Sequence, residues 1–196
     1  MKLLLLLIPL ATAFARVTTR KYIFSALTSL ICAVLVAVFA DTPLLFAGLF
    51  LSVPADYFMA HKNGRVNWFC AGILAFLAAH LLYCAHAIRY ARFSLPLTLL
   101  GAVMLVAYGV YLRRRILPAT PHLLKLPAAI YTITSIVSLI LGTMTHDLIY
   151  TAGIALLLFS DTLIAEREFP KYRKYQNLIL PTYYLCHIAL ALSAML

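Results

Sequence analysis

The sequence predicts an all-α integral membrane protein, a bundle of about eight transmembrane helices. Composition is the first reason, because 64% of the 196 residues are hydrophobic, 11% are charged and the mean hydropathy is +0.97. A soluble domain is about half apolar and about a quarter charged. The second reason is that apolar segments recur along the whole chain at membrane-spanning length. Since no long polar stretch remains, residues 1–196 are expected to form a single transmembrane helical domain.

Seven apolar segments have close to the roughly 20 residues that a spanning helix needs. They are too long and too continuously apolar for barrel strands, which alternate over about ten residues. Before them, Lys2 and the apolar run that follows resemble both a cleavable signal peptide and a short first membrane helix. We favour the helix, which brings the expected number to eight. The seven segments cover residues 22–40, 43–60, 67–88, 93–112, 126–142, 147–165 and 176–195.

Positive charges gather where the apolar segments end. Of the 16 Lys and Arg residues, 13 lie in four connections, at residues 16–21, 61–66, 113–125 and 166–175. Cytoplasmic connections carry such an excess, so these four are expected in the cytoplasm and both termini on the opposite side. The net charge of +10 is therefore attributed to topology and to anionic lipid, and no nucleic-acid partner is expected. The short chain and its minimal loops favour a multi-pass protein of the bacterial inner (cell) membrane.

Two aspartates lie inside apolar segments. Asp56 and Asp161 each follow an Ala-Gly pair by eight residues, and each precedes a cation, Lys62 or Arg167, by six. An ionisable side chain inside a membrane segment is costly and marks a functional site by default. The matching flanks suggest two four-helix repeats in parallel orientation, with both carboxylates about 9 Å below the cytoplasmic boundary.

At one depth on parallel helices, the two aspartates are expected to face one another. Two carboxyls in a dry site cannot both ionise easily, so that one acts as an acid and the other as a base. The alternative is that Asp56 and Asp161 are separate structural residues, bonded to backbone groups or to nearby hydroxyls such as Ser52 and Ser160.

Several other polar side chains are candidates for the same site. His80 and His187 lie inside apolar helices, and Tyr83 and Tyr183 lie near them in the sequence. A lone histidine in an apolar helix is more often a satisfied hydrogen-bonding group than a ligand, but the two aspartates make site membership a fair hypothesis. The four cysteines lie in apolar runs without metal-ligand spacing and are interpreted as buried hydrophobic residues.

Four blocks of the sequence, in this order, resemble the lysoplasmalogenase family of membrane proteins, also called the YhhN-like family. The blocks are GLFLSVPADYFMA, GILAFLAAHLLY, AGIALLLFSDTLIA and TYYLCHIAL. They are similar to the family's Gly-Leu-x-x-Ser-x-x-x-Asp, Phe-x-x-Ala-His-Leu-x-Tyr and Ser-Asp helices and to its closing Tyr-Tyr helix. The chain departs from the family pattern at Lys21-Tyr22-Ile23, where Lys-Pro-Leu is common, and at Ala55 and His187, where Gly and Gln are common.

The resemblance implies hydrolysis of the sn-1 vinyl ether of a lysoplasmalogen to a fatty aldehyde and glycerophosphoethanolamine or glycerophosphocholine. Such a bond breaks after protonation at carbon, which needs a positioned acid and an anion near the developing positive charge. Two carboxylates supply both without a metal or another cofactor, as they do in glycosidases. Either aspartate fits either role, and Asp56 is favoured as the acid because Pro54 suggests a more enclosed setting.

The remaining candidates receive binding roles under this hypothesis. His80, Tyr83, Tyr183 and His187 are expected to hold water or the ether oxygen. Lys21, together with the preceding Arg20, is expected to meet the phosphate of a lysophospholipid. The expected partners are this substrate and the surrounding membrane lipids, and the oligomeric state stays open.

Three rival interpretations remain open at the level of sequence. A metal-dependent lipid hydrolase would use His80, His187 and the two aspartates as zinc ligands, although no His-x-x-x-His pair is present. A proton-coupled lipid or small-molecule transporter would use buried acids and kinked helices. A purely structural membrane subunit would need the aspartates for stability alone.

Overall fold

The computed structural model describes residues 2–196, which form eight α-helices and no β-strand. The predicted all-α membrane bundle is therefore confirmed. A 3-10 turn, Lys2–Leu6, precedes the first helix, and a short π-helical segment, Leu112–Ile116, continues the fifth. The helices are α1 (Leu7–Thr19), α2 (Ile23–Phe39), α3 (Pro43–Ala60), α4 (Val66–Tyr90), α5 (Leu95–Tyr111), α6 (His122–Met144), α7 (Leu148–Glu168) and α8 (Ile179–Met195).

The helices have the length and composition of membrane spans. Within the described residues, seven helical stretches are long and apolar enough to cross a bilayer, and the first of them is Lys2–Thr19. The expected first helix is thus present, and it packs against α2 and α8. The eighth apolar helix, Ile23–Phe39, has 17 residues, or about 26 Å at 1.5 Å per residue, which is close to the thickness of the hydrocarbon core. The chain is an integral, multi-pass membrane protein.

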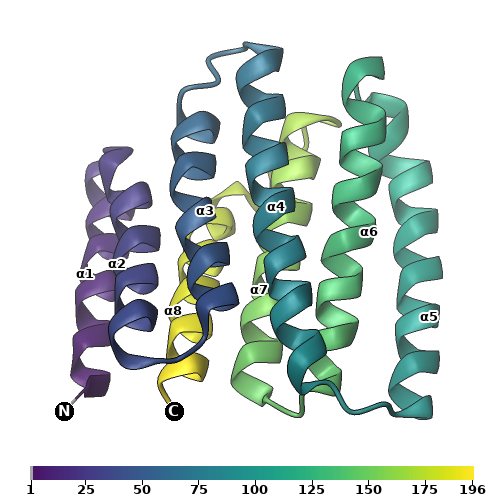
Figure 1. Cartoon of the computed structure of the whole chain (residues 1–196). Helices are drawn as coiled ribbons and strands as arrows, with labels where there is room; N and C mark the ends of the chain where they lie inside the picture. The colour runs from purple at the N-terminus through teal and green to yellow at the C-terminus, as the bar shows by residue number, and fades with distance from the viewer. Residues whose placement is uncertain (1) are drawn as a thin grey trace.

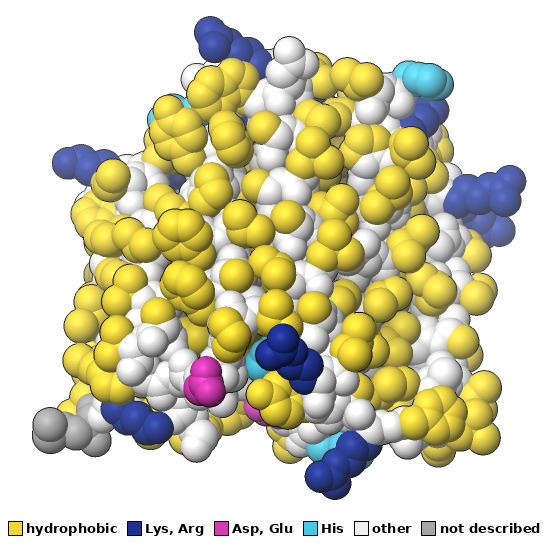
Figure 2. Space-filling view, in the orientation of Figure 1, with side chains coloured by type: hydrophobic (Ala, Val, Ile, Leu, Met, Phe, Trp, Pro, Cys, Tyr) yellow, Lys and Arg dark blue, Asp and Glu magenta, His cyan; other side chains and the backbone are white. Residues whose placement is uncertain are grey.

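The helices run up and down, and both termini lie at one end of the bundle (Figure 1). The four connections in which the sequence concentrates its positive charge all lie at the other end, which we call the cationic end (Figure 1). Hydrophobic side chains dominate the middle of the face seen in Figure 2, and charged side chains gather toward its two ends. This distribution is the one expected of a protein that crosses a bilayer.

The two halves of the chain pack in corresponding ways. The helix α3 packs mainly on α2 and α4, and α7 packs mainly on α6 and α8. Between the halves, α2 contacts α8 and α4 contacts α6. In both cases the second helix of one half contacts the fourth helix of the other half. This pattern supports the expected two four-helix repeats. The two aspartate-bearing helices, α3 and α7, are not among the main contacting pairs.

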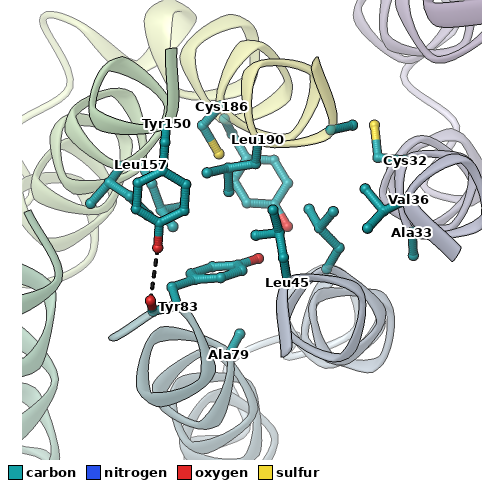
Figure 3. Packing of buried hydrophobic residues seen from close by; sticks show 14 of the residues in the cluster. Cys32, Ala33, Val36, Leu45, Ala79, Tyr83, Tyr150, Leu157, Cys186 and Leu190 are labelled. Carbon is teal, nitrogen blue, oxygen red and sulfur yellow. Dashed lines mark hydrogen bonds between the residues drawn. The ribbon is translucent and has the colours of Figure 1, made fainter. Parts of the chain in front are cut away.

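The buried core lies where α2, α3, α4, α7 and α8 meet (Figure 3). Two tyrosines cross it: the Tyr150 hydroxyl on α7 donates a 2.8 Å hydrogen bond to the backbone carbonyl of Tyr83 on α4. Each of these tyrosines is 1% exposed. The bond satisfies a phenol that would be costly to bury without a partner, and it fixes α4 against α7.

Small residues allow the helices to approach closely at this core. A Cβ atom added to Gly48 would lie 2.8 Å from Cδ1 of the buried Tyr83 ring, and one added to Gly153 would lie 3.1 Å from Leu190. These are the glycines that precede the two aspartates at equal spacing in the sequence. Small residues at such positions are what membrane helices use to pack closely, because no hydrophobic force drives their association in lipid.

Replacing Gly48 by alanine is expected to destabilise the bundle. The added methyl group would overlap the fully buried Tyr83 ring, and overpacking of this kind costs about 1–3 kcal/mol. Thermal unfolding of the purified protein in detergent measures the effect as a lower melting temperature. The matched control is Gly109→Ala in α5, where nothing lies within 4 Å of the new Cβ. Equal melting temperatures for the two variants would contradict the close approach of α3 and α4.

Candidate active site

Asp161 on α7 belongs to a compact hydrogen-bonded cluster. Its Oδ2 atom accepts a 2.6 Å bond from the Tyr131 hydroxyl and lies 3.3 Å from Nε2 of His80. The same His80 nitrogen lies 3.0 Å from the Tyr131 hydroxyl and 3.2 Å from Oγ of Ser135. Tyr131 and Ser135 are four residues apart on α6, so they face the same side of that helix. Three helices, α4, α6 and α7, thus meet at one carboxylate.

Asp56 on α3 has a different set of partners. Its Oδ2 atom accepts a 2.7 Å bond from the Ser29 hydroxyl on α2. Tyr183 on α8 lines the same cavity as Asp56, and its buried hydroxyl has no hydrogen-bond partner in the described part of the chain. One turn before Ser29, Ser25 bonds to the Tyr184 hydroxyl at 2.6 Å. The Asp56 carboxylate therefore lies where α2, α3 and α8 meet.

The surroundings of the two aspartates correspond between the halves of the chain. Each lies on the third helix of its half and accepts a bond from a hydroxyl on the second helix, Ser29 or Tyr131. A side chain from the fourth helix of the other half, Tyr183 or His80, completes each group. The two halves of the chain, which the sequence suggests are repeats, thus resemble each other also in the helices that surround each aspartate.

The serines nearest in sequence do not bond to the aspartates. Ser52 donates to the backbone carbonyl of Gly48 at 3.2 Å, and Ser160 donates to that of Ile179 at 3.1 Å. The suggestion that these two hydroxyls bond to the aspartates is therefore wrong, because each hydroxyl donates to a backbone carbonyl instead.

Two adjoining cavities contain the carboxylates. The one that Asp56 lines, here called the polar cavity, offers about 450 Å³ to water and lies at the cationic end. The one that Asp161 lines, here called the apolar cavity, is narrower, with about 70 Å³ open to water. Both share the side chains of Met59, Phe76 and Ile164 as a wall. The apolar cavity is otherwise lined mainly by Phe69, Ile73, Leu112, Ile116, Leu158 and Phe169, and the polar cavity by Arg16, Tyr22, Ser25, Lys62, Arg167 and Gln176.

Asp56 and Asp161, which the sequence predicts to face one another, lie in two adjoining cavities. Each carboxylate has its own hydrogen-bond donors and its own cavity. A substrate that passed the shared wall would extend from one carboxylate toward the other.

Of the four histidine and tyrosine candidates, two lie at the aspartates or their cavities and two lie in the core. His80 lies within the Asp161 cluster and Tyr183 lines the polar cavity. His187 is fully buried, with its Nδ1 atom 3.0 Å from the Tyr183 carbonyl, and it lines neither cavity. Tyr83 lies in the core, where its hydroxyl is 3.5 Å from Oγ of Ser52. His187 and Tyr83 therefore line neither cavity but pack against side chains that do or that contact Asp161, namely Tyr183 and His80.

The cations of the site differ from the predicted ones. Lys21 is exposed at the cationic end and lines neither cavity. Arg16, Lys62 and Arg167 line the polar cavity instead. Lys21 follows the end of α1, where Arg20 adopts a left-handed backbone conformation with φ 59°. The chain turns there, and the last turn of α1 presents Arg16 to the cavity.

Tyr131, Ser135, Ser29 and Arg16 are site residues that sequence reasoning missed. A pattern that points to three of them is present, since Ser25 and Ser29, like Tyr131 and Ser135, are polar residues spaced by four in apolar helices. Such spacing places both on one face of a helix. The pattern does not say which carboxylate this face meets, because the pairing depends on how the helices pack.

Metal ligation has no candidate group within residues 2–196. No set of three or more His, Cys, Asp or Glu side chains lies close enough there to hold a metal ion. The four cysteines are free, and three of them are buried. Cys32, Cys84 and Cys186 are buried, as predicted for small hydrophobic residues, and Cys70 is partly exposed.

Comparison with known proteins agrees with the four sequence blocks. The model of the YhhN family matches residues 4–194, which is nearly the whole chain. Comparison with curated proteins gave no match, and comparison with solved structures gave none either. The match covers both cavities and all eight helices, so that the chain belongs to the YhhN family, the family that contains lysoplasmalogenases.

Proposed function

We propose that the protein is a lysoplasmalogenase-like hydrolase that cleaves the sn-1 vinyl ether bond of lysoplasmalogens. The products are a fatty aldehyde and glycerophosphoethanolamine or glycerophosphocholine. Membership of the YhhN family supports this function at the level of the family. The observation that carries it is the pair of adjoining cavities, one polar and one apolar, each with a carboxylate.

The two cavities match the two ends of a lysolipid. A headgroup with its phosphate suits the polar cavity, which is lined by Arg16, Lys62 and Arg167. The first part of a hydrocarbon chain suits the apolar cavity, because its lining is mainly aliphatic and aromatic. The vinyl ether joins these two parts of the substrate, and in this pose it lies near the shared wall of Met59, Phe76 and Ile164, with one carboxylate on either side.

The proposed reaction begins with proton transfer to carbon. An aspartic acid protonates the vinyl carbon farther from the ether oxygen, and the positive charge then resides on the other carbon and the oxygen. Water adds to that second carbon and gives its proton to the other carboxylate. In the resulting hemiacetal the bond between carbon and the glycerol oxygen breaks, and this oxygen takes the proton that the second carboxyl group now holds. The hemiacetal hydroxyl gives its own proton to the first carboxylate, the aldehyde is released, and both aspartates return to their starting states. No metal or redox group takes part in these steps.

The hydrogen bonds favour Asp56 as the acid and Asp161 as the anion. Asp161 accepts the Tyr131 hydroxyl at 2.6 Å and faces His80, and donors of this kind stabilise a carboxylate. Asp56 accepts a bond from the Ser29 hydroxyl, and no histidine among the described residues lines its cavity. An anionic Asp161 stabilises the developing positive charge and receives the proton of the attacking water. His80, which contacts both Tyr131 and Asp161, keeps the base in place.

Aldehyde release from lysoplasmenylethanolamine tests the reaction directly. Purified protein is expected to release aldehyde equally with and without EDTA. Asp56→Asn and Asp161→Asn are each expected to lower the rate about 100-fold or more, since each removes a proton-transfer group. The matched control is Asp41→Asn, at an exposed aspartate that lines neither cavity, and its rate should equal that of the wild type.

Three outcomes would contradict the proposal. Absence of aldehyde with both ethanolamine and choline lysolipids would exclude the hydrolase and favour a transporter. Loss of activity in EDTA would indicate a metal-dependent hydrolase. Full activity in a folded Asp56→Asn or Asp161→Asn variant would exclude that aspartate from proton transfer.

Removing the Tyr131 hydroxyl is expected to slow the reaction without abolishing it. Tyr131→Phe deletes the 2.6 Å bond to Asp161, and a hydrogen bond to a charged group contributes about 1.5–3 kcal/mol, or roughly a 10- to 150-fold change in rate. The measurement is kcat for aldehyde release. Tyr90→Phe, at a tyrosine that is 52% exposed, is the matched control. An unchanged kcat in Tyr131→Phe would show that this bond does not support the base.

A further inference from the structure

Arg16 is a cation in the polar cavity that forms no direct ion pair with any described residue. Its Nε atom donates a 3.0 Å hydrogen bond to the Ser25 hydroxyl. Its guanidinium carbon lies 4.9 Å from the centre of the Tyr22 ring. Among residues 2–196, no acidic oxygen lies within 4.0 Å of it. The side chain is half-buried at the last turn of α1 and lines the cavity, so that its guanidinium faces this space without a direct ion pair.

The position of this guanidinium is held by three helices. Ser25, on α2, bonds to Arg16 on one side and to the Tyr184 hydroxyl of α8 at 2.6 Å on the other. The ring of Tyr22 covers one face of the guanidinium, a contact that arginine makes well. A donor fixed in this way loses little conformational freedom when it binds a ligand.

Two further cations line the same cavity and share one acid. The Lys62 ammonium lies 2.6 Å from Oε1 of Glu168, and Nε of Arg167 lies 2.9 Å from the same oxygen. Burial lowers the pKa of Lys62, and the Glu168 carboxylate opposes this shift. One carboxylate thus balances two cations, and with Arg16 the cavity carries an excess of positive charge beside Asp56.

We propose that the polar cavity is a binding site for a phosphodiester anion, with Arg16 as its principal ligand and Lys62 and Arg167 as supporting charges. The inference rests on the proposed function and assigns the headgroup phosphate of the lysolipid to Arg16. A planar guanidinium can donate two parallel hydrogen bonds to two phosphate oxygens, which an ammonium cannot. Its place in the cavity lining and its fixed position distinguish Arg16 from the exposed Lys21, which the sequence suggested for this role.

Binding of a lipid that cannot be hydrolysed tests the site apart from the reaction. The probe is a 1-O-alkyl lysophosphatidylethanolamine, whose saturated ether replaces the vinyl ether, titrated as a radiolabelled ligand onto protein in nanodiscs. Arg16→Gln is expected to raise the Kd about 10- to 100-fold, the effect of losing charge-assisted hydrogen bonds. The 1-O-alkylglycerol, which lacks the phosphate, should bind equally to wild type and variant. Glycerophosphoethanolamine, which lacks the chain, shows whether the site also takes a soluble phosphodiester.

Two further variants separate recognition of phosphate from general effects. Arg113→Gln removes the same charge at the cationic end from an exposed side chain that lines neither cavity, and it should leave the Kd unchanged. Ser25→Ala keeps all charges but releases the guanidinium, and it should weaken binding less than Arg16→Gln does. Melting temperatures establish that each variant is folded.

The Kd values of wild type and Arg16→Gln for the lysophospholipid decide the proposal. Arg16-dependent binding of the lysophospholipid supports the site, whether or not glycerophosphoethanolamine also binds. Equal Kd values for wild type and a folded Arg16→Gln variant would overturn it, as would a lysophospholipid that binds no more tightly than the alkylglycerol. Because the probe has no vinyl ether, failure to release aldehyde in the activity assay would reject the reaction and leave this binding result independent.

Discussion

A carboxylate among membrane-spanning helices must find hydrogen-bond donors within the protein, because the hydrocarbon core of the bilayer has no water to solvate it. In this chain, neighbouring helices supply them. Asp56 accepts a bond from Ser29 on α2, and Asp161 accepts one from Tyr131 on α6 and lies beside His80 on α4. The partners of two acidic side chains thus join five helices, α2, α3, α4, α6 and α7.

Close packing at the core makes these bonds geometrically available. Gly48 lets the ring of Tyr83 lie against α3, and the Tyr150 hydroxyl ties α7 to the backbone of α4. Because α4 is fixed on both sides, His80 can reach Asp161 and Phe76 can stand between the two cavities. Gly48 thus contributes to the site through helix spacing, although it lines neither cavity.

Separate cavities also give the two carboxylates different surroundings. The cavity of Asp56 is lined by arginine and lysine side chains and has room for water. The cavity of Asp161 is lined mainly by aliphatic and aromatic residues and by the donors of that carboxylate. Different environments are the usual way for two chemically identical acids to take different roles. The same residue type at corresponding positions of the two halves therefore lies in two unlike surroundings, because the residues around each aspartate differ.

The sequence by itself determined the all-α membrane class, the eight helices, the grouping of the cationic connections at one end and the two aspartates as the centres of interest. These follow from composition, segment length and charge placement, which are local properties of the chain. Tertiary structure alone decided that Ser29, Tyr131 and Ser135 surround the aspartates, that Tyr83 lies in the core, and that Arg16 replaces Lys21 in the polar cavity. A hydroxyl on an apolar helix has the same local sequence whether it faces lipid or a carboxylate. Its partner is set by the rotation and neighbours of each helix, which arise only when distant segments pack together.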